Sequence, residues 1–376
     1  MSMNEQRHES VCFVPSLQPT LGVELELQIV DAEQFYLRND IEALLRAMPS
    51  SSAEIAKREL FQCCVEINSS VCRTVKEAET ELRDKLRIVA EAGHSIGLAF
   101  LWGGTHPFSR WLEQETTQTP RYLGLVDSLQ DTARRAVTFG LHVHVGVDSG
   151  DKAILVGQRL CRDLPLLLAL SANSPFWCGR DTGLDSQRTV VWDTMPRAGL
   201  PPQLHNWSEY VWLVNHLKQT GFISSIRDIY WNVRPHHNFG TVEVRICDMP
   251  ASLADAMLLA AIIQCLVIWH DREVERGVFW DDIHPVIVQQ NKWRASRHGL
   301  SARLVGPDCT SILSIPAYLE ELQQRLRPIA DEMRCAAYLD RLPTFLSQGN
   351  GAQRQRDRYA MTGSLVKVAA GMVAPE

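Results

Sequence analysis

Residues 21–31 read Leu-Gly-Val-Glu-Leu-Glu-Leu-Gln-Ile-Val-Asp and alternate apolar with polar side chains. Because successive side chains of a β-strand point to opposite faces, this pattern predicts a strand with one apolar face and one face that carries Glu24, Glu26 and Gln28. No Lys or Arg within the stretch neutralises the two glutamates. At roughly 6 Å and an effective dielectric near 20 they repel each other by about 3 kcal/mol. A buried pair of this kind requires a cation or a raised pKa, whereas a strand with one solvated face requires neither, and residues 21–31 alone fit both interpretations.

Later segments repeat this division into an apolar and a polar face. Residues 139–148 place His142 and His144 on one side of a strand, and residues 241–247 place Glu243 and Arg245 on one side of another. Two further strands are expected over residues 59–68 and 97–102. Together the segments predict one concave, mainly antiparallel sheet with a cation site on its polar face. Strands and helices do not alternate regularly, so the fold class is α+β.

Helical periodicity occupies much of the remaining chain. The expected helices lie over residues 40–48, with Asp40 as a possible cap; over 74–93, where Thr74 and Glu77 form a capping box; over 152–172, with a kink at Pro165; and from Ser252 and Asp255 toward Glu273. The C-terminal third is expected to be mostly helical, with a polar break over residues 347–358. Residues 173–202 are rich in Gly, Pro, Ser and Asp, so we interpret them as a functional loop. Selectivity for the substrate is expected to depend chiefly on this loop and on the segment near residues 107–122.

Composition excludes several classes of function. The chain has 376 residues and a net charge of -6, so it offers no basic field for nucleic acid or anionic lipid. Its ten cysteines form no C-x-x-C pair, which favours reduced cytosolic thiols over a disulfide frame. The apolar run over residues 256–269 is too short for a membrane span and predicts a buried helix. We therefore expect a soluble, cytoplasmic protein with one domain over residues 1–376, of which residues 1–18 form a flexible segment.

The polar residues of the predicted sheet point to phosphoryl chemistry. Glutamates with one or two histidines favour hard cations such as Mg²⁺ or Mn²⁺. Arg188, Arg234 and Arg245 would supply planar forks for a carboxylate or a phosphate. Divalent cations together with arginines are the usual equipment of phosphoryl transfer, in which positioning and charge neutralisation do most of the work.

The chain resembles the bacterial carboxylate-amine ligases, also called glutamate-cysteine ligase type 2, whose catalytic fold is similar to that of glutamine synthetase. The resemblance spans residues 20–360 in many separate segments, among them Gly22-Val23-Glu24-Leu25-Glu26, Gly104-Thr105-His106-Pro107, Phe139 to Gly146, Leu170 to Phe176, Asp181 to Leu184, Pro196 to Gly199, Thr241 to Arg245, Asn291 to Ala295 and Gly351 to Arg356. It implies ATP-dependent joining of a carboxylate, typically the γ-carboxylate of glutamate, to an amine, typically that of cysteine, through an acyl phosphate. It also implies a homodimer.

The resemblance further implies roles for individual residues. Glu24, His142 and Glu243 would hold one metal ion, and Glu26, Glu59 and Glu66 would hold a second. Arg245, with Glu243, would act on the ATP phosphates and stabilise the transferring γ-phosphoryl group. Arg188 would hold substrate or phosphate, and Arg234 and His144 would contact substrate. The family usually has three consecutive glutamates where this chain has Glu24-Leu25-Glu26, and strand periodicity puts Leu25 on the far face.

Other interpretations remain open at this point. His144 fits a buried hydrogen bond as well as a site residue, Arg188 and Arg245 could be salt-bridge partners, and His236 and His237 are expected on the surface. The run 354–358 is expected to be a solvated loop. The rival functions are a nucleotide-binding regulatory protein on the same scaffold, a guanidino-group kinase and a metal hydrolase that uses His142, His144 and Glu243. For a ligase, Glu26→Ala or Glu243→Ala is expected to abolish ATP turnover and leave the fold intact.

Overall fold

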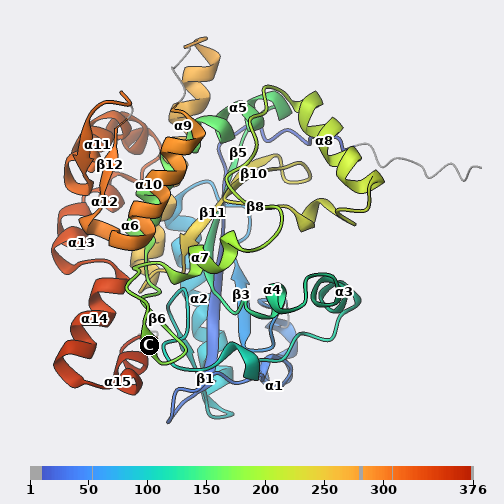
Figure 1. Cartoon of the computed structure of the whole chain (residues 1–376), viewed down its shortest axis with the longest axis vertical. Helices are drawn as coiled ribbons and strands as arrows, with labels where there is room; N and C mark the ends of the chain where they lie inside the picture. The colour runs from blue at the N-terminus through green and yellow to red at the C-terminus, as the bar shows by residue number, and fades with distance from the viewer. Residues whose placement is uncertain (1–10, 53, 279–282, 307, 374–376) are drawn as a thin grey trace, which may run out of the picture.

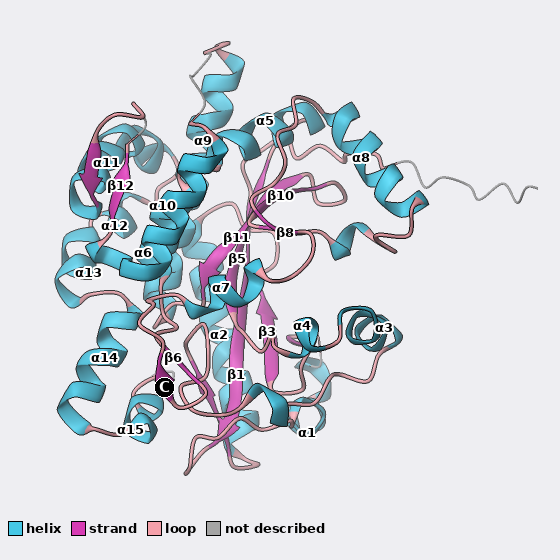
Figure 2. Cartoon of the chain, in the orientation of Figure 1, coloured by secondary structure: helices cyan, strands magenta, loops and turns pink. Residues whose placement is uncertain are grey.

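A computed structural model describes residues 11–52, 54–278, 283–306 and 308–373 (Figure 1). A seven-stranded sheet runs through the middle of the molecule, and helices pack against it (Figure 2). The strands follow the order β10-β11-β5-β1-β3-β2, with β4 also paired to β1. Their bounds are β1 (Leu21–Asp31), β2 (Ala56–Arg58), β3 (Cys64–Asn68), β4 (Leu98–Leu101), β5 (Gly140–Gly146), β10 (Val233–His236) and β11 (Thr241–Asp248). Every pairing in this sheet is antiparallel, which confirms the predicted α+β class.

The apolar face of β1 is the centre of the core, as the alternation predicts. Val23, Leu25, Leu27 and Ile29 are almost completely buried. Helices α2 (Val75–His94), α5 (Gly150–Leu160), α6 (Leu164–Ser171) and α9 (Leu253–Glu275) carry most of the apolar surface that covers this side of the sheet. Helix α9 is long and apolar enough to cross a membrane by length and hydropathy alone, but most of it is buried inside the protein. It is the core helix that its composition predicts.

The remaining elements surround this central unit. The other helices are α1 (Ile41–Ala47), α3 (Pro120–Leu129), α4 (Asp131–Arg134), α7 (Gln187–Asp193), α8 (Trp207–Gln219), α10 (Pro285–His298), α11 (Ile315–Glu332), α12 (Ala336–Leu339), α13 (Leu342–Gln348), α14 (Gly351–Thr362) and α15 (Leu365–Ala370). Three two-stranded sheets pair β6 (Phe176–Trp177) with β7 (Arg180–Asp181), β8 (Ala198–Gly199) with β9 (Tyr230–Trp231), and β12 (Arg303–Val305) with β13 (Ile312–Ser314).

Helix caps follow the sequence signals in part. The Thr74 side chain accepts a hydrogen bond from the Glu77 N–H, as predicted, but the Glu77 carboxylate accepts from the N–H of Arg73 in place of that of Thr74. Ser252 caps α9 by accepting from the Asp255 N–H. Asp40 precedes α1 without a side-chain cap bond. The predicted cap at Asp40 is therefore wrong, while the helix itself is confirmed.

Four predicted segments differ from the structure. Residues 59–68 are not one strand, because a turn separates β2 from β3 and leaves Glu59 just beyond β2. The helix expected over 152–172 is two helices, and Pro165 lies in the first turn of α6, where its missing N–H costs nothing. Residues 173–202 contain α7 and three short strands. The run expected as a solvated break over 347–358 is largely α14. Two of its arginines form ion pairs: Arg354 with Asp255, and Arg356 with Asp181 and Asp185.

The expectation of a flexible segment over 1–18 concerns residues 1–10, which lie outside the described part, and residues 11–18, which do not. Val14 N–H donates to the carbonyl of His237 at 2.8 Å, and Ser16 N–H donates to that of Val147 at 2.9 Å. Val11 is buried beside α8. Residues 11–18 are therefore attached to the edge of the sheet.

Candidate functional site

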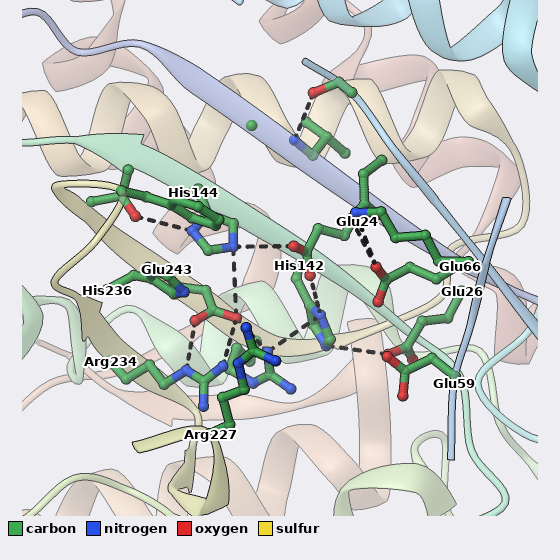
Figure 3. A pocket seen from close by; sticks show the side chains of 18 of the residues that line it. Glu24, Glu26, Glu59, Glu66, His142, His144, Arg227, Arg234, His236 and Glu243 are labelled. Atoms are coloured by element: carbon green, nitrogen blue, oxygen red, sulfur yellow. Dashed lines mark hydrogen bonds and ion pairs between the residues drawn. The ribbon is translucent and has the colours of Figure 1, made fainter. Parts of the chain in front are cut away.

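A cavity of about 910 Å³ lies on the polar face of the sheet. Its wall contains inward side chains of β1, β3, β5, β10 and β11 and Arg227 from the segment before β9 (Figure 3). Residues of α3 complete the wall. Strand register explains this convergence, since Glu24 lies opposite His142, Glu26 lies opposite Glu66, and Glu243 lies opposite His144. Side chains at such opposed positions are near neighbours on one face.

Glu24, His142 and Glu243 form the first group of possible cation ligands. One ligand atom from each lies within 4.8 Å of the other two. Nδ1 of His142 lies 3.0 Å from a Glu24 carboxylate oxygen. Burial opposes ionisation of Glu24, but hydrogen bonds with His142 and His144 hold its pKa well below the ordinary value. Carboxylate oxygens with one imidazole nitrogen are donors that suit Mg²⁺ or Mn²⁺.

Glu243 is held by two arginines on the same face. Arg234 Nε donates to Glu243 Oε2 at 2.6 Å, and Arg245 Nη1 donates to Oε1. Despite complete burial, these guanidinium groups keep the pKa of Glu243 well below its ordinary value. Removing the Glu243 carboxylate would leave two cations in the cavity wall without their partner, which is a costly change. The expectation that Glu243→Ala leaves the fold intact is therefore not supported by this geometry.

Glu26, Glu59 and Glu66 form a second group with a different electrostatic character. Burial, and then repulsion from Glu66 and Glu26, raises the pKa of Glu59 well above its ordinary value. Burial, and then repulsion from Glu24, raises the pKa of Glu66. Within the described residues the nearest side-chain cation is Lys57, whose Nζ lies 3.9 Å from Glu66 Oε1. Three converging carboxylates with so little compensation fit a divalent cation.

Neutral donors orient the carboxylates of this second group. The Tyr122 hydroxyl donates to Glu59 Oε2 at 3.4 Å, and Asn68 Nδ2 donates to Glu66 Oε1 at 2.7 Å. The Gly140 N–H donates to Glu26 Oε2. Nε2 of His142 lies 3.7 Å from Glu26 Oε1, so this ring contacts both carboxylate groups.

His144 lies in the cavity wall between two carboxylates. Its Nε2 is 3.4 Å from Glu24 and 3.7 Å from Glu243, and its Nδ1 is 3.0 Å from the hydroxyl of Thr241. Burial disfavours the charged ring, but Glu243 and Glu24 together raise the pKa of His144. Both interpretations of His144 thus describe it in part, because its ring lines the cavity and also forms a buried hydrogen bond with Thr241.

Arg188 does not reach the cavity. It lies in the first turn of α7 and is only 4% exposed. Its Nη1 donates to the Ile246 carbonyl at 3.2 Å, and its Nη2 donates to the Arg245 carbonyl at 3.4 Å. These carbonyls belong to a bulge in β11, where the register shifts between Val244 and Cys247. A side chain at Gly140 would collide with this guanidinium. This placement therefore does not support the expected contact of Arg188 with substrate or phosphate.

Several cavity residues were not singled out from the sequence. His236, expected on the surface, lies in the wall, where its ring stacks on Phe239 with centroids 4.0 Å apart. Because His236 is two residues after Arg234, strand alternation places both side chains on one face, and this signal could have identified it. Arg121 and Tyr122 of α3 end the segment near residues 107–122 that was expected to affect selectivity, although neither was named for a role. Arg227 comes from the segment before β9, whose sequence carries no comparable signal.

Leu25 is fully buried on the apolar face, as strand periodicity predicts. It packs away from Glu24 and Glu26, which both line the cavity. The departure from three consecutive glutamates therefore changes the core side of β1 and leaves the inward carboxylates in place.

Comparison with known proteins places this chain in a family. The model of glutamate-cysteine ligase family 2 matches residues 20–371. The chain belongs to glutamate-cysteine ligase family 2. A protein of Gloeobacter violaceus that carries the name "putative glutamate–cysteine ligase 2" is 44% identical over 97% of this chain and 99% of its own length. A protein of Thermobifida fusca with the same name is 38% identical over 96% of this chain and 92% of its own.

Solved structures show that the fold is shared more widely than the sequence. The glutamate–cysteine ligase of Francisella tularensis, solved in complex with AMP, superposes with a TM-score of 0.69 at 13% identity, over 95% of this chain and 89% of that one. A bifunctional glutathione synthetase of Pasteurella multocida gives a TM-score of 0.64 at 15% identity, over 94% of this chain and 52% of that one. At these identities the likeness establishes the ligase-type fold of the family 2 chain.

Proposed function

We propose that this family 2 protein is an ATP-dependent carboxylate-amine ligase that forms an amide through an acyl phosphate. The observation that carries the proposal is the pair of carboxylate groups on one sheet face, next to Arg234 and Arg245, in a chain that belongs to glutamate-cysteine ligase family 2. Glutamate and cysteine are the first acid and amine to test, because both relatives carry the name "putative glutamate–cysteine ligase 2".

The proposed reaction has two steps. A carboxylate oxygen of the acid attacks the γ-phosphorus of ATP, an O–P bond forms, and the bond from that phosphorus to the β,γ-bridging oxygen breaks, so that ADP leaves with the electron pair. The amine nitrogen then attacks the acyl carbon, phosphate leaves with the C–O electron pair, and the nitrogen loses a proton. Holding both reactants in one cavity can be worth roughly 7 kcal/mol or more of the barrier.

The donor set assigns residues to the ions that such a reaction uses. Glu24, His142 and Glu243 would hold one Mg²⁺ or Mn²⁺, and Glu26, Glu59 and Glu66 would hold the other. When bound, these ions would supply charge neutralisation for the phosphates. Arg245 and Arg234 present guanidinium groups that Glu243 fixes in direction, and His144 lies beside them to orient a bound substrate or phosphate.

Arg188 has a positioning role in this scheme. By donating to the carbonyls of Arg245 and Ile246, it fixes the β11 bulge and with it the backbone from which the Arg245 side chain projects. We further propose that residues 1–376 form a single ligase domain and that the protein is a cytoplasmic homodimer. Neither nucleic acid nor a membrane is among its proposed partners.

The proposal is tested by incubating the purified protein with ATP, Mg²⁺, glutamate and a panel of amines led by cysteine. Amine-dependent release of ADP and phosphate, with a new amide detected by mass spectrometry, supports a ligase. Transfer of phosphate to a stable phosphagen would instead indicate a guanidino-group kinase. Bound ATP without turnover over the panel would favour a regulatory protein, and hydrolysis without ATP would favour a metal hydrolase.

A further inference from the structure

Arg227 is an exposed residue at the wall of the cavity. It lies in the 3-10 turn η3 (Ile226–Asp228), between α8 and β9, and contributes to the cavity wall. Figure 3 shows its side chain extending into the cavity, toward the group formed by His142, Arg234 and Glu243. In the part of the chain that the structure describes, its guanidinium makes no hydrogen bond and no ion pair.

The backbone that carries Arg227 is nevertheless well held. Ser225 Oγ accepts from the Arg227 N–H at 3.2 Å, and Asp228 Oδ2 accepts from the N–H groups of Ser224 at 2.9 Å and Ser225 at 3.0 Å. Arg197 Nε donates to the Asp228 carbonyl at 3.0 Å. Because the turn is already fixed, the backbone at Arg227 loses little conformational entropy when an anion binds to the side chain.

The other cationic side chains of the cavity wall are already engaged. Arg234 and Arg245 both donate to Glu243. Lys57 faces Glu66 at 3.9 Å, and the guanidinium of Arg121 lies over the ring of Tyr122, 5.3 Å from its centroid. Among the described cations of the wall, only Arg121 and Arg227 keep all their N–H donors free, and the Arg121 guanidinium is already placed over the Tyr122 ring.

We propose that Arg227 binds the oxygens of the phosphoryl group while that group passes from ATP to the acid, an inference that rests on the proposed ligase function. Its side chain extends toward Glu243 and His142, the group proposed to hold one of the phosphate-binding ions. During transfer, negative charge spreads over the three equatorial oxygens of the phosphoryl group, and a planar guanidinium can donate to two of them at once. Arg227 forms no covalent bond and exchanges no proton, so its contribution is electrostatic and is greatest in the transition state.

The test compares the wild-type chain with Arg227→Ala and Arg227→Lys under ligation conditions. Arg227→Ala is expected to lower kcat by about 100-fold or more, a conservative part of the range that such arginines supply, while KM for ATP and for the acid changes by less than about threefold. Arg227→Lys is expected to recover only part of the rate, because a single ammonium cannot bridge two oxygens. Arg87→Ala, an exposed arginine of α2, is the matched control and leaves both constants unchanged.

A binding measurement makes the test independent of the acid and the amine. The probe is ADP with Mg²⁺ and aluminium fluoride, which mimics the planar phosphoryl group in transfer. Arg227→Ala is expected to weaken this complex about 100-fold and to leave the affinity for ADP alone unchanged. Equal affinity of both proteins for the mimic would overturn the proposal. A loss confined to KM for the acid would also overturn it, because Arg227 would then bind the acid's carboxylate. A wild-type chain that binds the mimic through Arg227 but makes no amide would count against the ligase function alone.

Discussion

Glu243, which is buried, and Glu59, which is partly buried, line one cavity, and their surroundings shift their pKa values in opposite directions. Arg234 and Arg245 stabilise the charge on Glu243, whereas burial and the neighbouring Glu66 and Glu26 destabilise the charge on Glu59. The same substitution, from glutamate to glutamine, should therefore have opposite effects on stability at the two positions.

In the presence of a chelator, we expect Glu59→Gln to raise the free energy of unfolding by about 1 kcal/mol, since it removes a repelling charge. Glu243→Gln should lower it by about 3 kcal/mol, since it leaves two guanidinium groups without their anion. Both variants should lose ligase activity. Denaturant unfolding with and without chelator measures the difference, and equal shifts at the two positions would contradict the assignment of the cation groups.

His106 provides a pH dependence that is separate from the cavity. Its Nδ1 accepts hydrogen bonds from the N–H groups of Ser109 at 2.8 Å and Phe108 at 3.2 Å, and its Nε2 faces the Phe35 carbonyl at 2.7 Å. Burial lowers the pKa of His106 to about 4, against roughly 6.5 in an unfolded chain. The neutral ring is thus the form that the folded state requires.

Between these two pKa values the unfolded chain binds more protons than the folded one, so stability falls as pH falls. We expect His106 to contribute stability that is fully present above about pH 6.5 and lost toward pH 4, by about 3 kcal/mol in total. The measurement is the difference in unfolding free energy between the wild type and His106→Gln from pH 7 to pH 4. This difference should shrink at low pH. A difference that is constant with pH would contradict the role of the neutral ring.

At the scale of elements, alternation was the strongest signal in the sequence. It predicted which faces of β1, β5 and β11 carry Glu24, His142, His144 and Glu243, because a period of two fixes the face of every side chain in a strand. The bulge in β11 was not predictable, since it depends on how β11 pairs with β5 and on where Arg188 packs. The sequence predicted a kink at Pro165 where the structure has a break between α5 and α6. A proline can interrupt a helix or occupy its first turn, and Pro165 lies in the first turn of α6.

The packing of Gly140 in β5 against Arg188 can be tested as a pair. A Cβ at Gly140 meets the Arg188 guanidinium, so Gly140→Ala should destabilise the protein by about 1–3 kcal/mol and disturb Arg245 through the bulge. In an Arg188→Ala background the same change should cost less, because the obstructing group is gone. A double-mutant cycle of unfolding free energies and kcat measures the coupling. Additive effects would show that the two residues act independently.

At the scale of the molecule, the resemblance to the family carried more information than local patterns. The segment order from β1 to α14 identified the fold and the family, both of which are confirmed by the family match and by the fold of related ligases. Arg121 and Tyr122, at the end of the expected selectivity segment near residues 107–122, line the cavity. Arg227 of η3 was not predicted, because it approaches from a short turn without a periodic pattern. Substrate selectivity is expected to depend on these same residues.

Cation binding should stabilise the whole protein, because the ligand groups are assembled only in the folded chain. A divalent cation that binds the native state alone adds about 2.7 kcal/mol at a concentration 100 times its Kd. We expect Mg²⁺ or Mn²⁺ to raise Tm in the wild type and to have a smaller effect in Glu66→Gln, which loses one carboxylate of the second group. The check is thermal unfolding over a titration of each cation, and identical titrations for both proteins would contradict a cation at Glu66.

The central claim is that the acid's own carboxylate takes the phosphoryl group from ATP. The measurement that tests it most directly uses an acid whose carboxylate oxygens carry a heavy isotope, followed by mass analysis of the released phosphate. An acyl-phosphate ligase transfers one labelled oxygen to phosphate for each amide formed. Phosphate without the label, at a wild-type rate of amide formation, would contradict the account.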